Sequence, residues 1–192
     1  MTICVFGASS KQMSDEYIKL IEDMGEYLAA KGHDLVFGSG CTGAMGAAAR
    51  GFRRGGGKTH GVVPKFFREE GLTDFVDYSC DKMTYTDTMN ERKQTMEDEA
   101  DCFVIAPGGI GTFEEFYEVL TLKQLGRHKK PIAVYNIGGY FDSMLATIDT
   151  AIEHHLAKPA LHGLYKATTN LDEMLEYLTE DTMQGIELSD LK

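Results

Sequence analysis

An apolar strand, a glycine-rich turn and a helix follow one another directly near the middle of this chain. Residues 102–106 read Cys-Phe-Val-Ile-Ala, which is typical of a buried strand, and apolar residues recur at helical spacing from Phe116 to Leu125. The turn between them is Pro107-Gly108-Gly109-Ile110-Gly111-Thr112. Free backbone N–H groups and the positive end of a helix dipole meet at such a turn, so the sequence predicts an anion site there.

Strand-like and helix-like segments alternate along the rest of the chain. We expect strands at 2–6, 34–37, 59–63, 75–79, 102–106 and 131–135, with loops at 69–74 and 157–163. Helices are expected at 15–31, 43–54, 86–100, 113–125, 140–155 and 170–178. This alternation predicts an α/β fold: a Rossmann-like, doubly wound, mainly parallel sheet with helices on both faces. One domain is expected over residues 1–192, with its ligand beyond the carboxyl ends of the strands.

Composition disfavours several classes of partner. The net charge is −11, whereas duplex binding requires many Lys and Arg side chains, so we expect no nucleic acid partner. No apolar stretch reaches the roughly 20 residues of a membrane span, and the chain starts directly in a strand pattern, so a cytoplasmic protein is expected. The four cysteines and six histidines show no metal-ligand spacing, so we expect reduced cysteines and no metal. Basic residues bunch at 50–58 and at 92–93, and either group could serve an anion pocket.

Three glycine-containing loops are expected to meet at one edge of the sheet. They are Gly7-Ala8-Ser9-Ser10, the segment 38–43 with Gly40 and Gly43, and the turn 107–112. Tight turning without any ligand is the alternative explanation for each loop. Segment 38–43 formally matches a dinucleotide fingerprint, yet the next strand end has no carboxylate for a ribose, so a nicotinamide cofactor is disfavoured. The predicted substrate-binding residues are Ser9, Gly40, Gly43, Met89, Gly108, Gly109, Ile110, Gly111 and Thr112.

A basic pair shares a helix face with two methionines. Met89, Arg92, Lys93 and Met96 are spaced i, i+3, i+4 and i+7, which directs the two cations towards the interior or a cleft. The alternative is that their stems pack while their charged heads extend into water. Beside an anion site, we favour the cleft.

Glu115 is the residue that suggests chemistry rather than binding alone. If Thr112 caps the helix, Glu115 lies in its first turn, close to whatever a bound phosphate carries. Thr112 and Glu115 also fit a capping box, a structural role that involves no catalysis.

These motifs together resemble the LONELY GUY (LOG) family of cytokinin riboside 5′-monophosphate phosphoribohydrolases, many of which are labelled lysine decarboxylases. The resemblance rests on Pro107-Gly108-Gly109-x-Gly111-Thr112-x-x-Glu115 and Met89-x-x-Arg92-Lys93-x-x-Met96, and it extends over nearly the whole chain. Two departures are Ser39, where members often have glycine, and Asn90, where they often have histidine.

The resemblance implies a Rossmann-like subunit that forms a homodimer or higher oligomer, and the reaction that it implies needs no cofactor. It implies hydrolysis of the N-glycosidic bond of a purine nucleoside 5′-monophosphate, with Glu115 and Arg92 as essential catalytic residues and Lys93 assisting. The loop from Gly108 to Thr112 would hold the 5′-phosphate. The alternatives are a non-catalytic nucleotide or phosphoanion carrier, a nucleotide nucleosidase of broader scope, and lysine decarboxylation, which needs pyridoxal phosphate.

Overall fold

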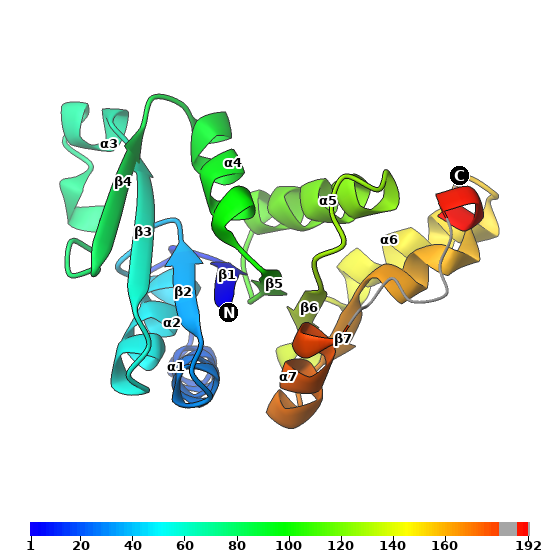
Figure 1. Ribbon diagram of the computed structural model, residues 1–192, viewed down its shortest axis with the longest axis horizontal. Coiled ribbons are helices and arrows are strands. Elements are labelled where there is room, and N and C mark those ends of the chain that lie inside the picture. Colours follow the sequence, from blue (N-terminus) through cyan, green and yellow to red (C-terminus); the bar gives the residue numbers. More distant parts are fainter. Residues whose placement is uncertain (181–187, 192) are drawn as a thin grey trace.

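A parallel sheet forms the centre of the molecule. The computed structural model describes residues 1–180 and 188–191. Within them, a seven-stranded sheet has the order β4-β3-β2-β1-β5-β6-β7, and every pair of neighbouring strands is parallel. The strands are β1 (Thr2–Phe6), β2 (Asp34–Phe37), β3 (Thr59–Pro64), β4 (Lys82–Thr86), β5 (Cys102–Ile105), β6 (Ile132–Tyr135) and β7 (Lys166–Thr168). The predicted Rossmann-like α/β class is confirmed (Figure 1).

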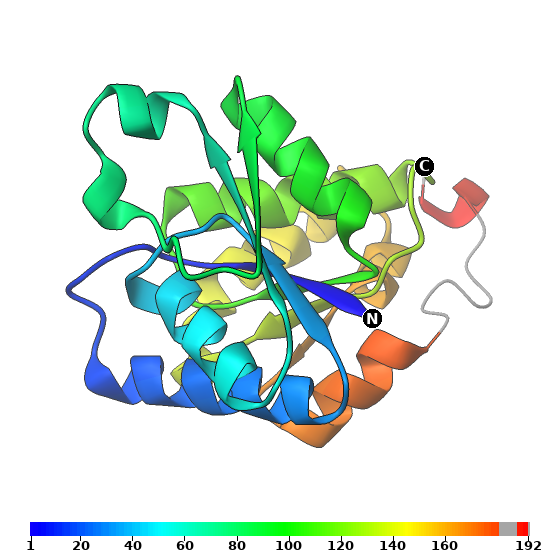
Figure 2. The same ribbon diagram turned by 60° about the vertical axis from the view of Figure 1, so that its left-hand side comes forward.

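Helices cover both faces of this sheet (Figures 1 and 2). One face carries α1 (Asp15–Ala30), α2 (Gly43–Arg54) and α7 (Leu171–Thr179). The other carries α4 (Met89–Glu99), α5 (Ile110–Gln124) and α6 (Asp142–Glu153). The short helix α3 (Phe66–Glu69) lies between β3 and β4 in the sequence. The described residues also form short 3-10 helices: η1 (Thr73–Phe75), η2 (Ile137–Gly139), η3 (Pro159–Leu164) and η4 (Leu188–Leu191).

The central strands are buried on both sides because each helix layer covers a hydrophobic core. In β1, Ile3 and Val5 face the α1–α2–α7 layer, whereas Cys4 and Phe6 face the α4–α5–α6 layer. This alternation follows from the two-residue period of a strand. It explains why β1, β2 and β5 are continuous apolar runs in the sequence.

Several expected elements differ from the structure. Residues 75–79, expected as a strand, contain the end of η1 and a turn. The edge strand that pairs with β3 is instead β4, Lys82–Thr86. The next helix therefore begins at Met89 rather than at 86, with the Thr88 hydroxyl capping the N–H of Glu91 at 3.1 Å. The expected loops contain part of α3 and η3, and β7 follows η3. Strand β4 lies at the sheet edge, and Thr86 is the one buried residue among its five. Met83 and Tyr85 alternate with polar residues, but this pattern is short and was not recognised as a strand.

The strand order creates a crevice at the carboxyl edge of the sheet. From β1 the chain proceeds outward on one side through β2, β3 and β4, and then returns to the other side of β1 as β5. The connections after β1 and β5 leave in opposite directions, which is the switch point at which doubly wound sheets bind ligands. The two loops also touch, because the Ala8 N–H donates to the Pro107 carbonyl at 3.2 Å.

Close packing of α1 against α2 predicts an unusual effect of one alanine substitution. A Cβ atom on Gly51 of α2 would lie 2.2 Å from the Glu22 carbonyl oxygen of α1, so Gly51→Ala must push the two helices apart. We expect urea denaturation to show a loss of about 1–3 kcal/mol, the range found for overpacked cores. Gly111→Ala in α5 is the matched control, because nothing lies within 4 Å of its Cβ position. Equal or greater stability of Gly51→Ala would contradict this packing.

Candidate active site

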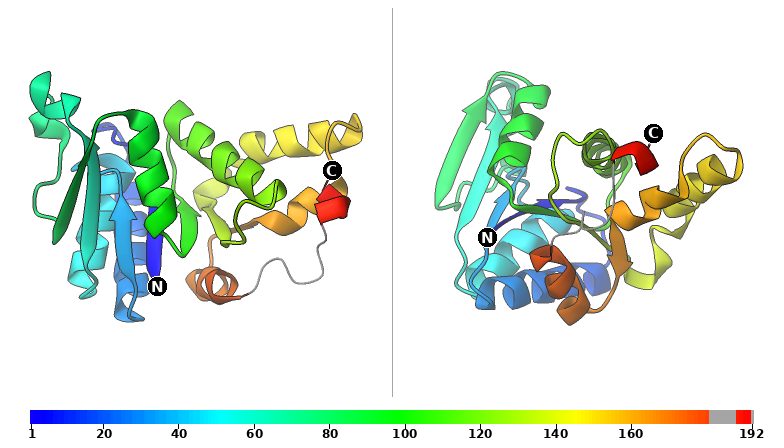
Figure 3. Two further views of the ribbon diagram at one scale, coloured as in Figure 1. Left: turned by 45° about the horizontal axis from the view of Figure 1, so that its top comes forward. Right: turned by 45° about the vertical axis from the view of Figure 1, so that its right-hand side comes forward.

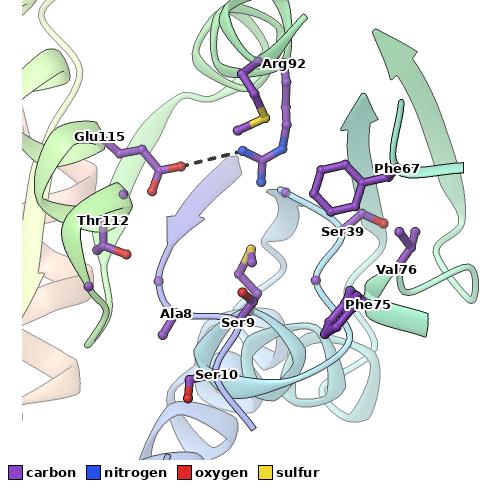
Figure 4. A pocket seen from close by; sticks show the side chains of 17 residues that line it. Ala8, Ser9, Ser10, Ser39, Phe67, Phe75, Val76, Arg92, Thr112 and Glu115 are labelled. Carbon is purple, nitrogen blue, oxygen red and sulfur yellow. Dashed lines mark ion pairs between the residues drawn. The ribbon is translucent and has the colours of Figure 1, made fainter. Parts of the chain in front are cut away.

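A cavity of about 490 Å³ opens at the carboxyl edge of the sheet, at the predicted switch point. Its walls come from the loops after β1 and β2, the segment around α3 and η1, and the first turns of α4 and α5 (Figure 4). Of the predicted site residues, the structure places these along it: Ser9, Gly40, Met89, Arg92, Gly109, Gly111, Thr112 and Glu115. The predicted residues Gly43, Lys93, Gly108 and Ile110 lie outside this lining.

Arg92 enters the cavity from α4 with its charge buried. Its side chain is 9% exposed, and its Nε donates to the Val62 carbonyl of β3 at 3.1 Å. The guanidinium group occupies the space beside Gly38, where a Cβ would lie 1.4 Å from Nη2. A side chain larger than glycine at position 38 would therefore displace Arg92. The alternative in which Arg92 extends its charge into water is wrong.

Glu115 faces Arg92 from α5 (Figure 4). Its Oε1 lies 3.8 Å from Arg92 Nη1, and its side chain is 14% exposed. Helix α5 begins at Ile110 with Gly109 as N-cap, so Thr112 is the third helical residue and Glu115 the sixth. The expectation that Glu115 lies in the first turn is therefore wrong, and so is the capping-box alternative. Its carboxylate is free of that structural role and points into the cavity.

Burial makes Glu115 unusually basic for a carboxylate. Burial raises the pKa of Glu115 to about 7, and the positive charge of Arg92 opposes that rise. Burial likewise lowers the pKa of Arg92, while Glu115 opposes that change. Near neutral pH, Glu115 therefore exchanges between its acid and carboxylate forms, as general acid–base catalysis requires.

The start of α5 closes one end of the cavity, where the sequence predicts an anion site. Gly109 and Gly111 line it with backbone, and the first N–H groups of a helix have no acceptor within the helix. Thr112 is buried and contributes its side chain to the lining. Behind them, the Tyr140 hydroxyl donates to the Gly108 carbonyl at 2.6 Å, which supports the loop from outside the cavity. The Ile110 side chain is 80% exposed, so this residue can contribute only its backbone.

An apolar wall opposite α5 was not predicted from the sequence. Phe67, Phe75 and Val76 line the cavity from the segment after β3 (Figure 4). Backbone hydrogen bonds fix this segment to the loop after β2, from Cys41 N–H to the Phe75 carbonyl at 3.0 Å and from Asp77 N–H to the Ser39 carbonyl at 2.7 Å. An aromatic pair just beyond the carboxyl end of a strand was the available signal, because loops at that edge form the site.

Ser39 is the point where the loop after β2 turns towards this wall. Its φ of 58° lies in the left-handed region, which favours glycine. Members of the family that the sequence resembles often have glycine at this position. In this chain, the buried Ser39 hydroxyl donates to the Asp77 carbonyl at 3.1 Å, which offsets part of the backbone strain by a further tie to the apolar wall.

The other basic residues serve as structural partners. Arg50 and Arg54 pair with acidic side chains of α1, including Glu22, and Arg53 pairs with Asp77 at 2.9 Å. Lys93 pairs with Glu114 and Glu118 of α5. Among the described residues that line the cavity, Arg92 is therefore the one cationic side chain.

The cysteines are thiols, and the described residues form no metal centre. All four cysteines are free. No group of three or more His, Cys, Asp or Glu side chains in residues 1–180 and 188–191 is arranged to hold a metal ion. In that same part of the chain, no helix combines the length and apolar character needed to span a bilayer.

The titration of Glu115 can be measured directly. In ¹³C NMR spectra of glutamate-labelled protein, we expect the Glu115 carboxyl to titrate near pH 7, above the ordinary glutamate value of about 4.3. Arg92→Gln should raise the midpoint further, because the carboxylate loses its nearest positive charge. Glu97, whose pKa burial also raises to about 7, is identified by loss of its signal in Glu97→Gln. A midpoint near the ordinary value in both the native protein and Arg92→Gln would show that the Glu115 carboxyl is hydrated rather than buried.

Comparison with known proteins identifies the family. A family model described as possible lysine decarboxylase matches residues 45–182. A cytokinin riboside 5′-monophosphate phosphoribohydrolase of Mycobacterium tuberculosis is 38% identical over 174 residues, which cover 91% of each protein. The Arabidopsis thaliana phosphoribohydrolase LOG3 is 34% identical over 178 residues, covering 93% of this chain and 81% of that protein.

Among solved structures, the molybdenum cofactor carrier protein of Chlamydomonas reinhardtii has a similar fold. Its TM-score is 0.67 at 19% identity, and the match covers 91% of this chain and 93% of the carrier. This likeness supports the Rossmann-like architecture. The sequence relatives decide the family: the chain belongs to the LOG family, the cytokinin riboside 5′-monophosphate phosphoribohydrolases.

Proposed function

We propose that this chain hydrolyses the N-glycosidic bond of purine nucleoside 5′-monophosphates, either cytokinin ribotides or AMP. The products are the free base and ribose 5-phosphate, and one domain over residues 1–192 carries the site. The observation that carries the proposal is a buried carboxylate, Glu115, one helical turn from the anion-binding start of α5. Relatives named as phosphoribohydrolases support the same reaction.

The substrate phosphate would bind at the start of α5. Backbone N–H groups at Gly109–Gly111 and the Thr112 hydroxyl supply donors, and the helix dipole adds positive potential. Thr112 and Glu115 are three positions apart in α5, so they share a face about 4.5 Å apart along the axis. A ribose anchored by its phosphate would then extend towards Glu115. Phosphate binding energy is in this way converted into orientation of the reacting carbon.

Cleavage needs stabilisation of positive charge on the sugar. As the bond from C1′ to the base nitrogen lengthens, the ribose gains oxocarbenium character. The Glu115 carboxylate stabilises this charge and accepts a proton from the attacking water, whose oxygen bonds to C1′. The base leaves with the bonding electron pair and gains one proton, so water is the only co-reactant. Arg92 keeps its charge and pairs with Glu115, so it orients the substrate and Glu115 rather than donating a proton.

Lysine decarboxylation, suggested by the family model's description, is a poor match to this cavity. That reaction uses pyridoxal phosphate bound to a lysine as a Schiff base. No lysine occurs among the described residues that line the cavity. Lys93, the nearest in sequence to Arg92, is paired with two carboxylates.

The proposal includes a homodimer acting in the cytoplasm without a nucleic acid partner. The dimer rests on the family resemblance, and light scattering at micromolar concentration tests it. The acidic balance of 30 Asp and Glu residues against 19 Lys and Arg residues supports the exclusion of nucleic acid.

The phosphate anchor predicts a strong preference for nucleotides over nucleosides. We expect chromatography to show release of adenine from AMP, or of the cytokinin base from isopentenyladenosine monophosphate. Turnover of the corresponding nucleosides should be poor, because they lack the group that the start of α5 binds. Equal turnover of both forms would contradict the anchor. A non-catalytic carrier would bind AMP without releasing adenine.

The charge of Glu115 predicts a selective loss of chemistry. Glu115→Gln keeps the size and one acceptor oxygen but removes the negative charge and cannot accept the proton, so kcat should fall by about 10²–10⁴-fold. Binding of AMP, measured by calorimetry, should persist because the phosphate site is intact. Glu16→Gln, on the exposed surface of α1, is the matched control and should retain activity. Full activity of Glu115→Gln would remove Glu115 from the mechanism.

A further inference from the structure

Lys93 is a predicted site residue that lies outside the cavity lining. It follows Arg92 in α4, but its side chain extends along the contact between α4 and α5, which lie side by side on one face of the sheet (Figures 1 and 3). Its Nζ lies 2.6 Å from Glu118 Oε2 and also bonds the Glu114 carboxylate. The side chain is 12% exposed. Lys93 is therefore committed to protein partners rather than available to a substrate.

The two partners of Lys93 flank Glu115 on its own helix. Glu114 precedes it, and Glu118 lies one turn further along α5. Adjacent residues of α4 thus engage one turn of α5: Arg92 faces Glu115 at 3.8 Å, while Lys93 bonds the carboxylates on either side. The Lys93 ion pairs therefore link α4 to α5 beside the point where Arg92 meets Glu115.

We propose that Lys93 is a positioning residue: by bonding Glu114 and Glu118 together it clamps α4 to α5 and holds Glu115 opposite Arg92. This inference rests on the proposed function. It assigns Lys93 no contact with the substrate. Two carboxylates share the ammonium group of a side chain that is 12% exposed, so the contact is a network rather than a single pair, although the Glu114 and Glu118 side chains are 53% and 34% exposed.

The same clamp balances the charge around Glu115. Burial lowers the pKa of Lys93, but its hydrogen bonds to Glu114 and Glu118 outweigh this, so its pKa is raised and the clamp stays charged at neutral pH. Burial is the largest influence on the pKa of Glu115, and neighbouring charges are the next. Arg92 and Lys93 of α4 lower this pKa, whereas Glu114 and Glu118 of α5 raise it. Cys4 of β1 also faces this group, and burial raises the pKa of its thiol well above the ordinary value, so it is neutral.

A kinetic comparison separates a clamp from a substrate contact. Lys93→Met should lower kcat for AMP by about 10²-fold, the cost of misplacing a reacting group by about 1 Å. KM should change by less than about threefold, because the phosphate site is untouched. Lys93→Arg should recover most of kcat, since a guanidinium fork can bond both carboxylates. Lys19→Met, which removes an exposed lysine paired with Asp23, is the matched control and should have native kinetics.

A variant that lacks both carboxylate partners of Lys93 decides between a clamp and a substrate contact. In the double variant Glu114→Gln/Glu118→Gln the clamp is already weakened, so adding Lys93→Met should reduce kcat by less than about threefold further, as expected for coupled residues. If Lys93 contacts the substrate, Lys93→Met will cost the same factor in both backgrounds and will raise KM. That result would overturn the proposal.

Two measurements that require no catalytic turnover, the Glu115 titration and hydrogen exchange, test the clamp independently of the proposed reaction. By ¹³C NMR, the Glu115 midpoint should rise in Lys93→Met and fall in Glu114→Gln/Glu118→Gln, and hydrogen exchange of α4 amides should accelerate in both. Lys19→Met should change neither quantity. If the native protein leaves AMP intact but these shifts occur, the proposed function fails and the clamp stands. Unchanged exchange in Lys93→Met would refute the clamp, whatever the native protein hydrolyses.

Discussion

The burial of one ion pair, Arg92 with Glu115, is the interaction on which the site depends. Removing two charges from water is costly, and a pair 3.8 Å apart recovers only part of that cost. The Val62 carbonyl satisfies the Arg92 Nε, and the raised pKa of Glu115 shows that the carboxylate remains incompletely compensated. A buried pair of this kind contributes little to stability. Its value lies in a carboxylate that is already desolvated and poised near neutral pH.

The sheet topology brings this pair to the anion site without long connections. Strand β5 carries the chain to the carboxyl edge, the next loop begins α5, and the same helix presents Glu115 one turn after Thr112. Arg92 arrives from the preceding helix, whose Thr88 cap fixes where α4 begins. In the proposed mechanism, phosphate binding and chemistry therefore share one helix. A ligand anchored at the start of α5 is held by the same element that carries the carboxylate.

The sequence revealed the parts of the site that have a strong local pattern. Glycines around 107–112 and the methionine spacing around Arg92 indicated the anion loop and the inward cation, and both line the cavity. The start of α5 was misplaced by three residues, because Thr112 is a good cap and Gly109 gives a weaker signal. The wall formed by Phe67 and Phe75 was missed, since it depends on an edge strand and on hydrogen bonds between distant loops. These long-range hydrogen bonds have no local signature, although the aromatic residues that follow β3 are a local signal for a wall of the site.

An acidic protein that binds an anion must create positive potential locally. With a net charge of −11, long-range attraction cannot draw a nucleotide to this chain. Within the described lining, the positive potential comes from the start of α5 and from Arg92, and Arg92 is already opposed by Glu115. Backbone dipoles hold a phosphate by geometry and add no full charge, so in the proposed mechanism we expect moderate binding of the substrate and of a ribose phosphate product. Moderate ground-state binding suits catalysis, because only interactions that strengthen in the transition state accelerate the reaction, and in the proposed mechanism that interaction is between Glu115 and the developing charge on the ribose.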